Sequence, residues 1–206
     1  MIKAGYYNAA TMRHSDLFHA IALHAAFADG TCLGPMDVRI PPGLSAVVGG
    51  ERTGKTTLLR LIHEHTLSRA TSTGGLPSER LDLDLPGLDA VTIRAFWDQC
   101  PVDPQADGLR EQLVNAWSMA PHLDKRLDML SKGHRRKAAL VAHLCSPAPV
   151  ICLDQPFAAL DATSARALVN ALKQWENAPA RAVVIADYVA HPALDWQQVI
   201  ELPQRG

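Results

Sequence analysis

Two kinds of hydrophobic pattern alternate along the chain, a strand-like period of two and the three-and-four spacing of a helix. The first pattern predicts strands at residues 21–27, 36–40, 44–50, 90–97, 149–154, 181–187 and 197–202. The second predicts helices at residues 53–67, 108–120, 134–145 and 164–176. Residues 68–89 are rich in Ser, Gly, Pro and Asp, so we expect a loop there with at most one short strand.

This order of elements predicts an α/β protein with a mostly parallel sheet that is covered by helices on both faces. In such sheets, ligands bind at the carboxyl ends of the strands. The 206 residues are enough for one core, and we expect a single domain over residues 17–206 after an extension at residues 1–16. Asp161, Thr163 or Ser164 is able to cap the helix that follows them.

The composition excludes several classes of protein. Apolar residues make up 48% and charged residues 20%, with a net charge of −1, so nothing points to nucleic acid or an anionic membrane as a partner. The four cysteines and nine histidines lack metal-ligand spacing, and such cysteine usage suits a reducing cytoplasm. No run approaches the roughly 18 apolar residues of a membrane span. We therefore expect any membrane role to depend on a partner and not on direct insertion.

A phosphate-binding loop follows the strand predicted at residues 44–50. It has the pattern Gly-x-x-x-x-Gly-Lys-Thr, which ends at Lys55 and Thr56. In this pattern the backbone N–H groups surround the phosphates, the lysine reaches the β and γ phosphates, and the hydroxyl binds Mg²⁺. The residues predicted to bind nucleotide here are Gly49, Gly50, Glu51, Arg52, Thr53, Gly54, Lys55, Thr56 and Thr57.

An apolar strand that ends in Asp154 supplies a carboxylate to hold the metal. Around it, the run LSKGHRRKAALVAHLCSPAPVICLDQPFAALD resembles the segment of ATP-binding cassette (ABC) ATPases from signature motif through Walker B to D-loop. Ser131 and Gly133 match the signature, whereas Lys132 and His134 do not. Asp161 matches the D-loop.

Two further residues take their roles from this resemblance, which covers about residues 20–202. Gln99 stands where the family's Q-loop glutamine contacts the metal and the attacking water. Phe27 stands where an aromatic ring stacks on adenine. The resemblance thus implies ATP and Mg²⁺ as cofactors.

The family also implies partners. Two ATPase domains pack head to tail, so we expect a homodimer, or a heterodimer with another ABC ATPase subunit. The helical subdomain at about residues 100–146 is short, and the chain is most similar to compact subunits such as that of the haem exporter of cytochrome c maturation. We expect an integral membrane transporter subunit as partner, and a cytoplasmic location on the inner face of the cell membrane.

Three positions depart from the family: the signature, the catalytic glutamate and the switch histidine. Gln155 replaces the glutamate, and a general base typically contributes about 10²–10⁴-fold to the rate. Asp187 or Tyr188 stands where the histidine is expected, and Tyr188 is able to donate to a γ-phosphate oxygen. Gln155 is either natural or an engineered replacement of Glu, and the other two departures favour the natural origin.

Two functions follow from these observations. The first is an ATP-binding subunit of an ABC-type transporter with reduced ATPase turnover. The alternative is a regulatory or assembly module that binds ATP and barely hydrolyses it. A soluble ABC protein of DNA repair or translation is disfavoured, because the chain has neither a coiled-coil insertion nor a second cassette.

Overall fold

A computed structural model describes residues 16–26, 32–73, 79–80, 88–106 and 108–204. At its centre lies a five-stranded sheet with the order β4-β5-β6-β3-β7, and each pair of neighbouring strands is parallel. The strands are β3 (Gly43–Val48), β4 (Glu79–Arg80), β5 (Val150–Asp154), β6 (Ala182–Asp187) and β7 (Gln198–Glu201). The predicted α/β class with a parallel sheet is confirmed.

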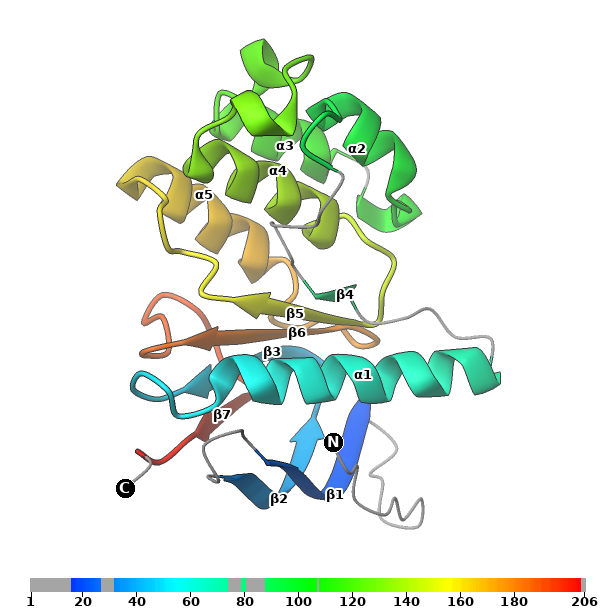
Figure 1. The fold of residues 1–206 in the computed structure, drawn as a ribbon, viewed down its shortest axis with the longest axis vertical. Helices are drawn as coiled ribbons and strands as arrows, with labels where there is room; N and C mark the ends of the chain where they lie inside the picture. The colour runs from blue at the N-terminus through cyan, green and yellow to red at the C-terminus, as the bar shows by residue number, and fades with distance from the viewer. Residues whose placement is uncertain (1–15, 27–31, 74–78, 81–87, 107, 205–206) are drawn as a thin grey trace.

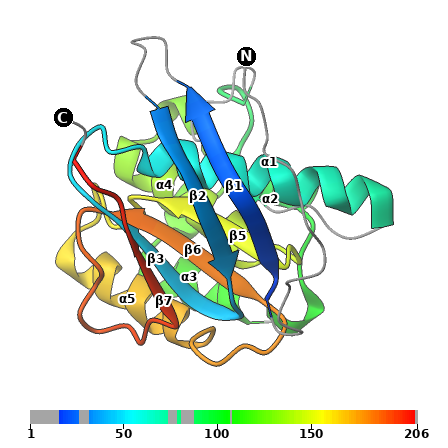
Figure 2. The same cartoon turned by 90° about the horizontal axis from the view of Figure 1, so that it is seen from below.

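Different elements cover the two faces of this sheet (Figure 1). One face carries α2 (Ile93–Gln99), α3 (Leu109–Ala116), α4 (Lys132–Leu144) and α5 (Ala162–Lys173), joined by the short 3-10 turns η2 (Pro104–Ala106), η3 (Ala120–His122) and η4 (Leu127–Met129). The other face carries α1 (Lys55–Thr73) and the antiparallel pair β1 (Phe18–Ala26) and β2 (Cys32–Ile40). Figure 2 shows this pair crossing the sheet beside α1.

The core consists of two clusters because successive side chains of a strand point to opposite faces. On β6, Val183 and Ile185 pack with the helices α3, α4 and α5. Val184 and Ala186 pack with α1, β1 and β2. A strand that is apolar on both faces suits the middle of a covered parallel sheet. The site described below lies where these buried strands end.

The strand predicted at residues 90–97 is wrong, because this segment forms α2. Its β-branched and aromatic residues suit strands, but Thr92 caps a helix by accepting a hydrogen bond from the Ala95 amide at 3.2 Å. Ile93 and Trp97 are the buried residues of this helix and lie four positions apart. The Trp97 Nε1 donates to the Ala138 carbonyl of α4 at 2.8 Å. The local cap, together with the burial of Ile93 and Trp97 against the rest of the fold, decides the conformation.

The other predicted elements have mixed outcomes. The short strand expected within residues 68–89 is confirmed as β4, and α1 extends beyond the predicted residues 53–67 to Thr73. Residues 1–15 of the expected extension, and Phe27, lie outside the described residues. None of the helices described here is both long enough and apolar enough to span a membrane.

Candidate nucleotide-binding site

The phosphate-binding loop connects β3 to α1. Gly54 has a φ of 103°, a left-handed conformation that favours glycine, just before the helix begins at Lys55. Arg52 also has a positive φ, of 58°. The Thr53 hydroxyl donates to the Gly50 carbonyl at 3.1 Å and so closes the loop on itself. Strain of this kind at Arg52 occurs where a ligand site requires a special backbone shape.

Lys55 is buried, with 6% of its surface exposed. Its Nζ donates to the carbonyls of Gly49 at 2.8 Å and Gly50 at 2.5 Å, and lies 4.8 Å from the centre of the Tyr188 ring. Within the described part of the chain, the contacts of this ammonium are all with neutral groups, and burying a charge without an opposite charge is costly. Phosphate oxygens would supply the missing opposite charge, so this lysine favours an anionic ligand.

A side-chain hydrogen bond joins the loop to the end of β5. The Thr56 hydroxyl donates to Asp154 Oδ2 at 2.6 Å, although the two residues are 98 positions apart. Asp154 Oδ1 is inaccessible and has no hydrogen-bond partner among the described residues. A hydroxyl beside a carboxylate with an unpaired oxygen is the oxygen donor set that Mg²⁺ binds, with phosphates and water as its remaining ligands. Thr56 and Asp154 therefore fit Mg²⁺.

No larger metal centre accompanies this pair in the part of the chain that is described. There, no three His, Cys, Asp or Glu side chains come together in a group that could hold a metal ion. Two protein ligands are compatible with Mg²⁺, which usually keeps several water molecules and substrate phosphates.

The turn after Asp154 is held from two sides. Gln155 has a φ of 44°, which is unusual for a residue with a side chain. Its amide donates to the Ala186 carbonyl at 2.8 Å, and its own carbonyl accepts a hydrogen bond from Arg136 of α4. The backbone at the predicted catalytic position is thus tied both to β6 and to the signature helix α4.

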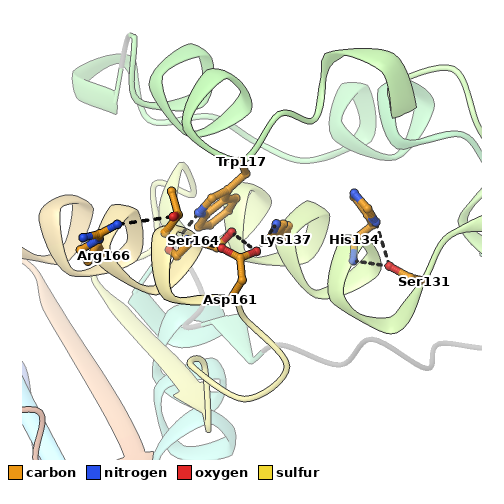
Figure 3. A network of polar contacts seen from close by, with 8 residues as sticks. Trp117, Ser131, His134, Lys137, Asp161, Ser164 and Arg166 are labelled. Atoms are coloured by element: carbon orange, nitrogen blue, oxygen red, sulfur yellow. Dashed lines mark hydrogen bonds and ion pairs between the residues drawn. The ribbon is translucent and has the colours of Figure 1, made fainter.

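Asp161 caps α5 and links it to α4 (Figure 3). Its Oδ1 accepts from the Ser164 amide at 2.8 Å, and its Oδ2 accepts from the Ser164 hydroxyl at 2.9 Å and from Lys137 Nζ at 3.4 Å. The hydrogen bonds from Ser164, and then the charge of Lys137, lower the pKa of Asp161 to about 2. Trp117, the residue that follows the last turn of α3, donates from Nε1 to the Ser164 carbonyl at 3.0 Å.

The signature segment lies at the start of α4, where Ser131 is the N-cap. Its hydroxyl accepts from the His134 amide at 3.2 Å and lies 2.8 Å from His134 Nδ1 (Figure 3). The ring of His134 lies 4.2 Å from that of His122. Burial, and then the charges of His122 and Lys137, lower the pKa of His134. The lowered pKa favours the neutral imidazole beside Ser131, at the position where the resemblance implies a glutamine.

Gly133 lies close to the D-loop, because a Cβ added there would come within 3.1 Å of the Ala159 carbonyl. The signature and the D-loop therefore pack against each other within one chain. This contact accounts for a glycine at position 133.

The structure brings together some of the predicted residues and separates others. The phosphate-binding loop, Asp154, Gln155 and Tyr188 lie at the same edge of the sheet, since β3, β5 and β6 are neighbours. Gln99 is the last residue of α2, and among the described residues no contact links it to the phosphate-binding loop or to Asp154. Its role at the metal stays a prediction, as does that of Phe27.

Sequence reasoning missed three contacts at the site. The tie from Arg136 to the Gln155 carbonyl, the pairing of His134 with His122, and the approach of Tyr188 to Lys55 depend on the fold. The sequence shows the cluster of basic residues at the start of α4, but it does not show which groups they contact.

Comparisons with known proteins agree with this geometry. No protein-family model matches the chain. The chain is 30% identical over 158 residues to the cytochrome c biogenesis ATP-binding export protein CcmA of Xanthomonas oryzae pv. oryzae, an alignment that covers 68% of this chain and 74% of that protein. It is 27% identical over 182 residues to the aliphatic sulfonates import ATP-binding protein SsuB of Rhodopseudomonas palustris, covering 82% of this chain and 64% of that protein. The chain spans less than two thirds of the length of several curated relatives.

Solved structures share the fold. The dimeric structure of MJ0796, a bacterial ABC transporter cassette, superposes with a TM-score of 0.60 at 17% identity, and the match covers 82% of this chain and 85% of that chain. At this level of identity the similarity concerns the fold alone.

Proposed function

The chain belongs to the ABC ATPase family, and from this premise we propose that it is the ATP-binding subunit of an ABC-type transporter. The observation that carries the proposal is the 2.6 Å contact between Thr56 and Asp154, which joins the phosphate-binding loop to the end of β5. With the buried Lys55, this contact supports the proposal by bringing the predicted phosphate and metal ligands to one edge of the sheet.

In the proposed complex, Mg-ATP occupies the phosphate-binding loop. Lys55 leaves the carbonyls of Gly49 and Gly50 and binds the β and γ phosphates. Thr56 and Asp154 hold Mg²⁺, which neutralises negative charge on the phosphates when it is bound. Gly54 and the other residues of the loop present backbone N–H groups to the phosphates.

A second ABC ATPase subunit completes the site, either another copy of this chain or a different protein. Ser131 and Gly133 of one subunit lie opposite the phosphate-binding loop of the other in this arrangement. The support within this chain is chemical. Ser131 and Lys132 are exposed at the start of α4, where the helix dipole and the positive side chain both favour an anion from outside.

An integral membrane transporter subunit is the partner that this motor would move, with the ATPase at the cytoplasmic face of the membrane. The names of the relatives support this, since one is an export protein and another an import protein. Purification of the chain from detergent-solubilised membranes, followed by mass spectrometry, tests the point. An integral membrane protein should co-purify, and its reproducible absence would contradict the transport role.

Isothermal titration with Mg-ATP tests the nucleotide site. We expect about one ATP per chain and a loss of binding in Lys55→Ala, because the cation at the centre of the loop is removed. Lys173→Ala is the matched control, since Lys173 is exposed in the last turn of α5. Equal affinities of the wild-type chain and Lys55→Ala would refute the site.

Gln155 favours a second candidate, a module that binds ATP without turnover and regulates assembly. An amide cannot take a proton from water, so this residue can hold the water but cannot activate it. Phosphate release separates the two candidates. Turnover above the Lys55→Ala background supports the transporter subunit, whereas binding without turnover supports the module.

A further inference from the structure

The edge of the sheet that holds the proposed nucleotide site carries a carboxylate whose side chain has no role in the proposed function. Parallel pairing places Asp154 of β5 beside Ala186 of β6, and Asp187 of β6 beside Val48 of β3. Tyr188 therefore lies between the end of β5 and the phosphate-binding loop. A side chain of the loop that reaches Tyr188 would also lie near Lys55, the residue proposed to bind the γ phosphate.

Glu51 is that side chain. It is exposed on the loop, and its Oε1 lies 3.5 Å from the Tyr188 hydroxyl. The ring of the same tyrosine lies 4.8 Å from Lys55 Nζ. Tyr188 thus connects the lysine that would bind the γ phosphate to a carboxylate on the same loop.

Two other carboxylates at this edge, Asp154 and Asp187, have different partners. Asp154 accepts a hydrogen bond from the Thr56 hydroxyl and is a proposed ligand of Mg²⁺. Asp187 Oδ1 accepts a hydrogen bond from the Tyr188 amide at 2.8 Å. Gln155, at the end of β5, is an amide whose backbone is fixed by Ala186. Of Glu51, Asp154 and Asp187, Glu51 is the one whose described contact is the Tyr188 hydroxyl.

We propose that Glu51 is the general base for ATP hydrolysis and that Tyr188 orients its carboxylate. This proposal rests on the proposed function. Glu51 takes a proton from a water molecule while the water oxygen forms a bond to the γ phosphorus. The bond between that phosphorus and the bridging oxygen breaks, and ADP leaves with the electron pair. Glu51 then releases the proton to solvent, which leaves ADP and inorganic phosphate.

Two features make this arrangement physically reasonable. The negative carboxylate would be repelled by the triphosphate, but Lys55 and the backbone N–H groups of the loop offset the charge. Room for movement is also present, because a cavity of about 400 Å³ adjoins Tyr188. It is lined by Gly49, Gly50, Val189 and Val199, among others. The ring therefore has space beside it into which it would move off Lys55 when phosphates enter.

The test measures phosphate release at saturating Mg-ATP together with ATP affinity by titration. We expect Glu51→Gln to lower turnover by about 10²–10⁴-fold, with ATP affinity unchanged or increased because a negative charge is removed. Tyr188→Phe should lower turnover by about 2–10-fold, as expected for one lost hydrogen bond. Glu64→Gln is the matched control on the exposed surface of α1, and it should behave like the wild-type chain.

A rescue variant shows whether the loss of turnover in Glu51→Gln comes from the missing general base or from a change in structure. Gln155→Glu in the Glu51→Gln background restores a carboxylate at the end of β5, and we expect it to recover turnover. Unchanged turnover in Glu51→Gln would overturn the proposal, and so would a loss confined to Asp187→Asn. Turnover of the wild-type chain no higher than that of Lys55→Ala would also overturn it. In each case normal ATP binding would leave the proposed nucleotide site standing, whereas an absence of ATP binding would refute both.

Discussion

The contact between Thr56 and Asp154 makes a quantitative prediction about stability. Thr56→Val removes the hydroxyl that donates to Asp154 Oδ2 at 2.6 Å and leaves that carboxylate without its described partner. A hydrogen bond to a charged group contributes about 1.5–3 kcal/mol. Because Thr56 is exposed, we expect the lower end of this range, about 1.5 kcal/mol, or about a tenfold change in the folding equilibrium.

A double-mutant cycle isolates this interaction from other effects of each substitution. The free energy of unfolding is measured in urea, without nucleotide, for the wild-type chain, Thr56→Val, Asp154→Ala and the double variant. We expect a coupling energy of about 1–1.5 kcal/mol. The matched control is Thr66→Val on the same helix, whose hydroxyl donates to backbone carbonyls of α1. It should show no coupling to Asp154.

A coupling energy below about 0.3 kcal/mol for Thr56 and Asp154 would refute the contact, since distant sites are additive within about that error. The same variants report on the metal. Titration of Thr56→Val with ATP should show that the gain in affinity from Mg²⁺ is lost, because the variant lacks one of the two proposed protein ligands. Thr66→Val should keep that gain.

Three further predictions concern the elements around the site. Asp161 has a pKa lowered from 3.8 to about 2, so its contribution to stability is present above about pH 4 and is lost as the pH falls toward 2. Urea unfolding from pH 2 to 6 should therefore show a weaker acid dependence of stability for Asp161→Asn than for the wild-type chain. An unchanged pH profile would contradict this. Trp117→Phe removes a buried hydrogen bond to the Ser164 carbonyl and should lower the free energy of unfolding by about 1–3 kcal/mol; a change below 0.5 kcal/mol would count against the bond. Thr92→Ala removes the cap of α2 and should destabilise the protein by about 1 kcal/mol, whereas Thr92→Ser should largely preserve its stability.

The strands and helices with a clear period were predictable because burial on one or both faces imposes the pattern. The β5 strand, the capped helix α5 and the phosphate-binding loop follow from local sequence, and the structure has all three. The sequence left three capping residues open for α5, and the hydrogen bonds to Ser164 select Asp161.

The segment at residues 90–97 was not predictable from propensity. Val91, Thr92 and Ile93 favour strands, but the helix is decided by a capping hydroxyl and by burial of Ile93 and Trp97 on one side. The spacing of those two residues was a helical signal within a segment too short to show a second turn. Gln99, which lies two residues beyond the predicted strand, is instead the last residue of this helix.

The contacts that give the site its chemistry were out of reach for a different reason. Tyr188 meets Lys55 and Glu51 because β6 and β3 are adjacent in the sheet, and strand order is not written in the hydrophobic pattern. Likewise, Arg136 reaches Gln155 only through the packing of α4 beside the end of β5. Motifs located the parts of the site, and topology determined which parts touch.

A crystal structure of the chain with Mg-ATP tests the central claim most directly, and the decisive measurement is the position of Lys55 Nζ. We predict that it leaves the Gly49 and Gly50 carbonyls and lies within hydrogen-bonding distance of the β and γ phosphates. Mg²⁺ should lie beside Thr56 and Asp154. A triphosphate bound elsewhere, with Lys55 still on the two carbonyls, would contradict the account.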